Sequence, residues 1–141
     1  FKVQETVNFL SSRDIPVCSH IGMLPQSLHK MGGYKIQGNS SSEATRLLKL
    51  AADLEEEGAE ILVLELVAKK LTKEITSTVK IPTIGIGSGP STGGQILVLH
   101  DILGLESKIK PKFIKNFMKG NDSLKQCVDS FVVAVRSGKY P

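Results

Sequence analysis

Glu65 is the one acidic residue in the apolar run ILVLELVA at positions 61–68. An ionised carboxylate that leaves water has to be paired, coordinated or neutralised, and glutamate is almost never fully buried without a partner. The run contains no Lys or Arg, so a structural ion pair would need a residue from another strand. The second interpretation is a catalytic carboxylate, because a desolvated glutamate is suited to moving protons near neutral pH. We favour a catalytic role for Glu65 and keep the ion pair as the alternative.

Polar and glycine residues also close the other apolar runs of the chain. They are Ser19 and His20 in the run 15–22, Gly85, Gly87 and Ser88 in or just after the run 81–87, and His100 and Asp101 in the run 95–102. Functional residues of parallel sheets lie at the carboxyl ends of the strands, so we expect these groups to lie close together along that end of the sheet, the predicted rim. His20 is a second candidate, although a histidine at the end of an apolar strand is more often structural. His100 and Asp101 are adjacent, so on a strand they would point to opposite faces.

The glycine-rich segment GIGSGPSTGGQ, residues 85–95, fails the templates for phosphate binding. From Gly89 to Gly94 the spacing fits a phosphate loop, but Gln95 and Ile96 replace the Lys and the Ser or Thr that hold phosphate and magnesium. The third glycine of the dinucleotide-binding motif is also missing. We therefore expect a tight turn between strand and helix, with its backbone near a ligand, instead of a nucleotide site.

Hydrophobic periodicity predicts the elements that position these candidates. Strands are predicted over 15–22, 61–68, 81–87 and 95–102, and helices over about 2–12, from Ser40 to Gly58, after residue 68, and in a tail interrupted by Pro111 and Gly120. Ser40 stands three residues before Glu43, which is typical of a capping box. Gly58 is well suited to a left-handed C-terminal cap.

Apolar strands separated by helices indicate an α/β fold with a parallel sheet covered on both faces. Four strands fit a small open sheet or one half of a (β/α)8 TIM barrel, which usually takes about 250 residues. The length of 141 residues favours the open sheet and a single domain, 1–141. The half barrel is favoured by Phe1, because the chain opens inside an amphipathic pattern with no strand before it.

The composition, 40% hydrophobic and 23% charged, is typical of a globular protein. No apolar run approaches the ~20 residues that cross a bilayer, and the start does not read as a secretion signal. We therefore expect an intracellular, cytoplasmic chain with no membrane partner. Cys18 and Cys127 lie far apart without a CxxC motif, which argues against a disulfide framework and a zinc site.

The net charge of +4 comes from residues 101–141, which carry eight basic and four acidic side chains. Its centre is SKIKPKFIKNFMKG, residues 107–120, with lysines that include Lys108 and Lys110. Lysines interleaved with aromatic residues are also found in nucleic-acid contacts. However, one side of a helix would gather the apolar residues of this segment, and helices normally bury such a stripe. We predict a core-facing helix and no nucleic-acid partner. The apolar residues are Phe113, Ile114, Phe117 and Met118.

Several longer segments, in this order and spacing, resemble the ketopantoate hydroxymethyltransferase family over nearly the whole chain. They are PVCSHIGMLPQS (16–27), GGYKIQG (32–38), ILVLE (61–65), PTIGIGSG (82–89), GGQILVLHDILG (93–104) and PKFIKNF (111–117). The match is to the carboxyl-terminal portion of that family. The segments are far more specific than a generic glycine motif.

The resemblance implies a (β/α)8 barrel that assembles into a large homo-oligomer, with the four predicted strands as its fifth to eighth. It implies transfer of a hydroxymethyl group from 5,10-methylenetetrahydrofolate to 3-methyl-2-oxobutanoate, which gives ketopantoate for pantothenate and coenzyme A synthesis. Glu65 falls on the proton-transferring glutamate of the family and His20 on the histidine that lines its substrate pocket. A metal polarises the keto oxygen in such chemistry. The family's Mg²⁺ ligands lie before this chain begins, so we expect none within it.

Two alternatives stay open beside this enzyme. In the first alternative the chain is not part of a complete transferase; it is a non-catalytic half barrel that serves as a remnant or an assembly module. A magnesium-dependent lyase or mutase that acts on 2-oxo acids, of the phosphoenolpyruvate mutase and isocitrate lyase sort, shares the barrel architecture. The segment GGYKIQG argues against that second class. We expect the chain alone to be inactive, because it supplies a base and no metal site.

Overall fold

The computed structural model describes residues 2–27, 32–105 and 111–141. Contacts divide the chain into two compact units, Phe1–Gly94 and Gln95–Pro141, which are described separately. The lysines Lys108 and Lys110 of the basic segment lie outside the described residues.

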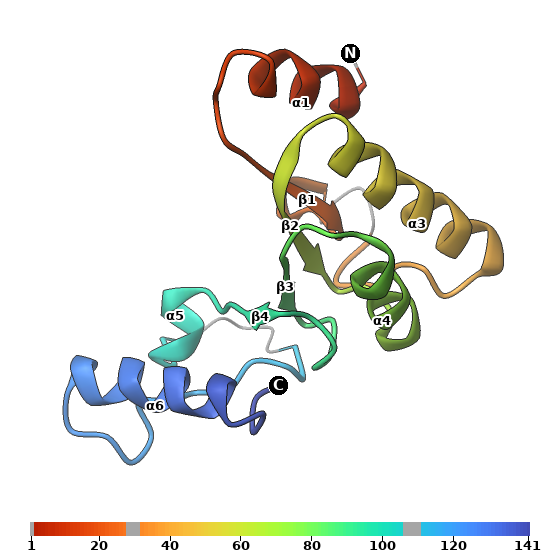
Figure 1. The fold of residues 1–141 in the computed structure, drawn as a ribbon. Helices are drawn as coiled ribbons and strands as arrows, with labels where there is room; N and C mark the ends of the chain where they lie inside the picture. Colours follow the sequence, from red (N-terminus) through yellow and green to blue (C-terminus); the bar gives the residue numbers. More distant parts are fainter. Residues whose placement is uncertain (1, 28–31, 106–110) are drawn as a thin grey trace. The chain divides into compact units, whose positions relative to one another are not determined.

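Helices and strands alternate along the first unit, as the periodicity predicts (Figure 1). The elements are α1 (Val3–Ser11), β1 (Val17–Gly22), the short 3-10 helix η1 (Pro25–Ser27), α3 (Ser41–Glu56), β2 (Ala59–Glu65), α4 (Lys69–Thr78), β3 (Thr83–Ile86) and β4 (Gly94–Gln95). The sheet order is β1-β2-β3-β4, and the pairs β1–β2 and β2–β3 are parallel. This arrangement confirms an α/β fold with crossover helices, and it agrees with part of a TIM-like barrel.

The two faces of the sheet differ in burial. One face packs against the helices and includes Ile21, Leu62 and Leu64, which share a core with residues of α1, α3 and α4. On the other face Cys18 is exposed and Ile61 is 38% exposed. The expectation of a sheet covered on both faces is therefore wrong for this unit. A barrel strand explains the difference, because one of its faces meets helices and the other faces the barrel interior.

Helix α3 begins and ends where its sequence predicts. The Ser40 hydroxyl accepts a hydrogen bond from the backbone N–H of Glu43 at 3.3 Å, which satisfies one free donor of the first turn. After the helix, Gly58 adopts φ +100°, a conformation that favours glycine. The chain then enters β2 directly, so the cap fixes the start of the strand that ends in Glu65.

The described residues of the second unit beyond β4, 96–105 and 111–141, form two helices and connecting turns. Its helices are α5 (Leu99–Ile102) and α6 (Leu124–Arg136). Its core includes Phe117, Phe131 and Tyr140, whose rings meet edge to face with centroids 5.4–5.7 Å apart. The interpretation of residues 111–120 as a core-facing helix is wrong, because they form turns, although Phe117 is buried.

The predicted fourth strand, 95–102, is also wrong over most of its length. Only Gly94 and Gln95 form β4, and residues 99–102 form helix α5. His100 and Asp101 therefore lie on a helix of the second unit and do not end a strand.

Candidate active site

The strand register places His20 and Glu65 on the same face of the sheet. His20 pairs with Val63, and Gly22 pairs with Glu65. Side chains two residues apart on a strand share a face, so His20 and Glu65 are diagonal neighbours on adjacent strands. This is the face that carries exposed Cys18 and Ile61, away from the helices. Glu65 is the last residue of β2, at the carboxyl end of the sheet.

Glu65 Oε2 lies 3.1 Å from His20 Nε2. The glutamate is 8% exposed, and the histidine side chain is 33% exposed. In the described part of the chain, no Lys or Arg forms an ion pair with Glu65. His20 Nε2 is buried and has no partner with hydrogen-bond geometry, so it lies at contact distance from the carboxylate without donating to it. The pair therefore places a buried ring nitrogen of a partly exposed histidine beside the carboxylate.

The chain changes direction immediately after Glu65, and backbone hydrogen bonds fix this change. The Met23 N–H donates to the Glu65 carbonyl at 2.9 Å, and the Leu66 N–H donates to the Ile86 carbonyl at 2.9 Å. Leu66 has φ +49°, a left-handed conformation that is uncommon for a residue with a branched side chain. No sequence signal marks this conformation, because leucine is not a residue that favours it.

The segment GGYKIQG is anchored to the same turn. The Gln37 N–H donates to the Leu66 carbonyl at 2.7 Å, and the Gln37 carbonyl accepts from the Ala68 N–H at 2.9 Å. Gln37 and Val67 thus form an isolated parallel bridge. A loop that carries one of the specific segments of the family resemblance therefore ends at the turn that follows Glu65.

The other residues of the predicted rim do not all contribute to this site. Ser19 is 5% exposed and lies on the helix-facing side of β1, opposite to His20. Ser88 is fully buried, and its hydroxyl bonds to backbone groups. His100 and Asp101 belong to the second unit. The structure therefore brings together His20 and Glu65 from the predicted set, with Ser88 behind them.

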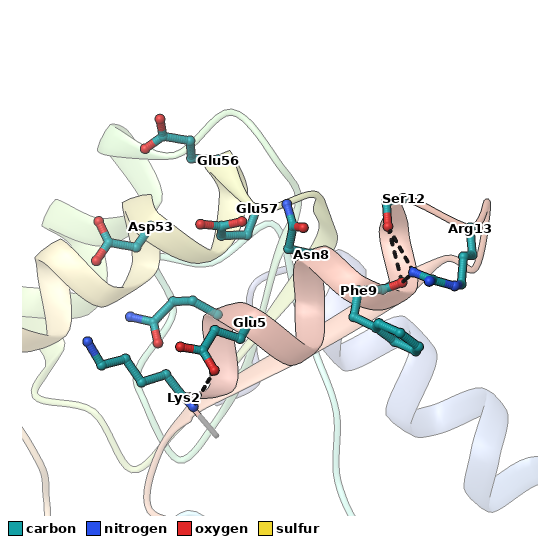
Figure 2. Close-up of a pocket in the computed structure, with 10 residues that line it drawn as sticks. Lys2, Glu5, Asn8, Phe9, Ser12, Arg13, Asp53, Glu56 and Glu57 are labelled. Carbon is teal, nitrogen blue, oxygen red and sulfur yellow. Dashed lines mark hydrogen bonds between the residues drawn. The ribbon is translucent and has the colours of Figure 1, made fainter.

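A groove of about 680 Å³ lies elsewhere on the first unit, between α1 and α3 (Figure 2). Its lining is strongly charged and includes Glu5, Arg13, Asp53, Glu56 and Glu57. Neither His20 nor Glu65 lines it. The groove therefore does not belong to the candidate active site.

No group of three or more His, Cys, Asp or Glu side chains within the described residues could hold a metal ion. Among the helices of this same part of the chain, none is both long and apolar enough to cross a membrane.

Comparison with known proteins decides the family. The family model described as ketopantoate hydroxymethyltransferase matches residues 1–141. The chain belongs to the ketopantoate hydroxymethyltransferase family. This confirms the resemblance that the segments around His20 and Glu65 indicate.

Curated relatives of the family share about half of their residues with this chain. The protein of Nitrosomonas eutropha is 52% identical over 137 residues, and that of Nitrosomonas europaea is 49% identical over the same length. A relative from Hahella chejuensis is 47% identical. The first two are named 3-methyl-2-oxobutanoate hydroxymethyltransferase, and the third 3-methyl-2-oxobutanoate hydroxymethyltransferase 2. Each match covers 97% of this chain and 51–52% of the relative, so the chain spans about half the length of these proteins.

Proposed function

We propose that this chain is the carboxyl-terminal half of a (β/α)8 hydroxymethyltransferase. The complete barrel would transfer the one-carbon unit of 5,10-methylenetetrahydrofolate to C3 of 3-methyl-2-oxobutanoate as a hydroxymethyl group, with water as the source of the hydroxyl group, and produce 2-dehydropantoate and tetrahydrofolate. The observation that carries the proposal is the pair His20 and Glu65, 3.1 Å apart at the carboxyl end of the sheet, on the face that the helices leave open. That end and that face are where barrel enzymes hold their catalytic groups.

Glu65 is proposed as the proton-transfer residue. Formation of the new carbon–carbon bond requires loss of a weakly acidic proton from C3 of the keto acid and delivery of a proton to the new hydroxyl group. A carboxylate that is 8% exposed and has no Lys or Arg partner among the described residues is suited to either step. Both roles, base and acid, stay open for Glu65.

His20 is proposed as a substrate-binding residue. Its Nε2 atom is buried and lacks a hydrogen-bond partner, and a buried polar atom of this kind costs free energy until a partner arrives. A keto or carboxylate oxygen of the substrate would supply that partner. His20 would then orient the substrate beside the Glu65 carboxylate.

The negative charge of an enolate needs a cationic or polarising group near the keto oxygen. Among the described residues, no Lys or Arg forms an ion pair with Glu65, and no group of three or more His, Cys, Asp or Glu side chains could hold a metal ion. As the resemblance to the family implies, we place the group that stabilises this charge, Mg²⁺ in our proposal, in the half of the barrel that this chain does not supply. We accordingly propose that residues 1–141 form one domain only together with that half, and that the chain is inactive by itself.

The remaining predictions concern the oligomeric state, the cellular compartment and the partners of this enzyme. A homo-oligomer in the cytoplasm, with small-molecule substrates and no nucleic-acid or membrane partner, is proposed from the family. The alternative of a non-catalytic half barrel predicts the same strand register and the same open face. Only activity separates the two.

The test uses the complete protein and the isolated chain side by side. Consumption of methylenetetrahydrofolate that depends on 3-methyl-2-oxobutanoate is expected for the complete protein and not for the isolated chain. A complete protein that does not consume methylenetetrahydrofolate but cleaves or rearranges another 2-oxo acid would establish the lyase or mutase alternative. A folded complete protein with neither activity would overturn both enzyme proposals.

A further inference from the structure

Ser88 follows β3 and lies directly behind the turn that carries Glu65. Its side chain is fully buried, with 0% of the residue exposed. Its hydroxyl donates to the Leu64 carbonyl at 2.7 Å and accepts from the Val67 N–H at 3.0 Å. The Ile86 carbonyl, at 3.4 Å, is a longer second acceptor for the same hydroxyl hydrogen.

These two bonds lie on either side of Glu65 and Leu66. The Leu64 carbonyl comes immediately before Glu65, and the Val67 N–H comes immediately after Leu66. The strand ends at Glu65; beyond it the Leu66 N–H still donates to the Ile86 carbonyl of β3, whereas the Val67 N–H donates to the Ser88 side chain. The Ser88 hydroxyl thus bridges the Leu64 carbonyl and the Val67 N–H, two backbone groups that would lie farther apart in a regular strand.

The turn needs such a support because of its conformation. Leu66 holds φ +49°, and a non-glycine residue persists in this conformation only where its surroundings impose it. The backbone bonds of Leu66 to Ile86 and Gln37 fix its own N–H and carbonyl. Ser88 supplies the two bonds to the flanking residues. Loss of the hydroxyl would leave a buried N–H and a buried carbonyl without this partner, and the turn would relax.

Ser88 itself cannot contact the substrate. It is completely buried, and its single donor hydrogen is used by a backbone carbonyl. Its effect on the reaction would pass through the position of Glu65. We infer that Ser88 is a positioning residue, which holds the turn at residues 64–67 so that the Glu65 carboxylate meets His20 and the substrate. This inference rests on the proposed role of Glu65.

The test is a double-mutant cycle in the complete protein with Ser88→Ala and Glu65→Gln. We expect Ser88→Ala to lower kcat about 10- to 100-fold, the effect of moving a catalytic group by a fraction of an ångström to an ångström, with little change in KM. In the Glu65→Gln background the same substitution should lower kcat by less than about threefold, because the group that it positions is already gone. Ser88→Cys, which keeps a weak donor and acceptor, should give an intermediate kcat.

Thr83→Val is the matched control. Thr83 is 2% exposed at the opposite, amino end of β3, and its hydroxyl lies 3.0 Å from the hydroxyl of Thr76. This substitution also removes a buried hydroxyl, so its thermal stability should fall about as much as that of Ser88→Ala while kcat stays within about twofold of the parent. A fall in kcat as large as that of Ser88→Ala would show that lost stability explains both, and would overturn the inference.

The outcomes separate the inference from the function on which it rests. If Glu65→Gln is impaired but Ser88→Ala has the parent kcat, or if the two effects multiply fully, Ser88 does not act through Glu65. If Glu65→Gln has the parent kcat, the proposed role of Glu65 fails first and the inference falls with it. Should Ser88→Ala not fold, the cycle is run with Ser88→Cys. A smaller fall in kcat that largely disappears in the Glu65→Gln background supports the inference. A fall in kcat by the same factor in both backgrounds overturns it.

Discussion

The approach of β1 to the last residue of β2 offers a second way to move Glu65. Gly22 has φ +102°, and a Cβ atom added to it would lie 2.1 Å from the Glu65 carbonyl oxygen and 2.9 Å from Val67 Cγ2. Real Cβ contacts essentially never fall below 3.0 Å. The substitution Gly22→Ala therefore has to push the two strand ends apart at Glu65, the residue that we propose as catalytic.

The size of the effect follows from these distances. The Glu65 backbone must move by about 0.9 Å to restore contact at 3.0 Å from the present 2.1 Å, and a misplacement of about 1 Å costs on the order of 100-fold in rate. The bond from the Met23 N–H to the Glu65 carbonyl, 2.9 Å long, would be strained by the same movement. Alanine at a positive φ adds a stability loss of more than about 1 kcal/mol.

The assay is steady-state kinetics and thermal unfolding of the complete protein with Gly22→Ala. Gly120→Ala is the control, because Gly120 has φ +88° but nothing within 4 Å of an added Cβ. The control should lose stability through its backbone alone and keep the parent kcat. If Gly22→Ala also keeps the parent kcat, the reasoning that the end of β1 fixes the position of Glu65 is refuted.

Two further predictions concern stability. Ser40→Ala should lower the free energy of unfolding by about 1 kcal/mol, because it removes the cap of α3 that accepts from the Glu43 N–H, and it should leave kcat unchanged; a calorimetric scan with a kinetic assay checks both. Burial, with a smaller contribution from the Asp101 charge, raises the pKa of Tyr140 to about 12. The neutral phenol, which donates to the Phe113 carbonyl, is thus the form that folding favours. Stability should be complete below the ordinary tyrosine pKa of 10.0 and fall as pH rises toward about 12, and ultraviolet titration of tyrosine that gives an ordinary pKa would contradict this.

The sequence was sufficient to predict the elements that carry the site. Strands β1, β2 and β3 are apolar along their length, and Ser40 and Gly58 mark the ends of α3, so local rules agree there with the final structure. The position of Glu65 at a strand end also follows from the pattern. Its contact with His20 does not, because the register between β1 and β2 depends on packing across the sheet.

The two wrong element predictions, the strand over 95–102 and the helix in residues 111–120, lie where the local sequence pattern and the tertiary environment disagree. An apolar run cannot be assigned to strand or helix from periodicity alone, and β4 is last in the sheet order, with a neighbour on one side. Ile96, Val98 and Leu99 are 42–55% exposed there, so burial does not hold them in a strand. In residues 111–120 the Asn116 side chain accepts from the Met118 N–H at 2.8 Å, and this local bond competes with a helix.

The most direct test of the account is the turnover of the complete protein with Glu65→Gln. This substitution keeps the size of a side chain that is 8% exposed, but it removes the carboxylate, 3.1 Å from His20, that we propose transfers protons. We predict that kcat falls by about 10²–10⁴, the usual contribution of general acid–base catalysis, while the protein still folds and binds the keto acid. A folded variant with a kcat close to that of the parent would contradict the central claim that Glu65 transfers protons in this reaction.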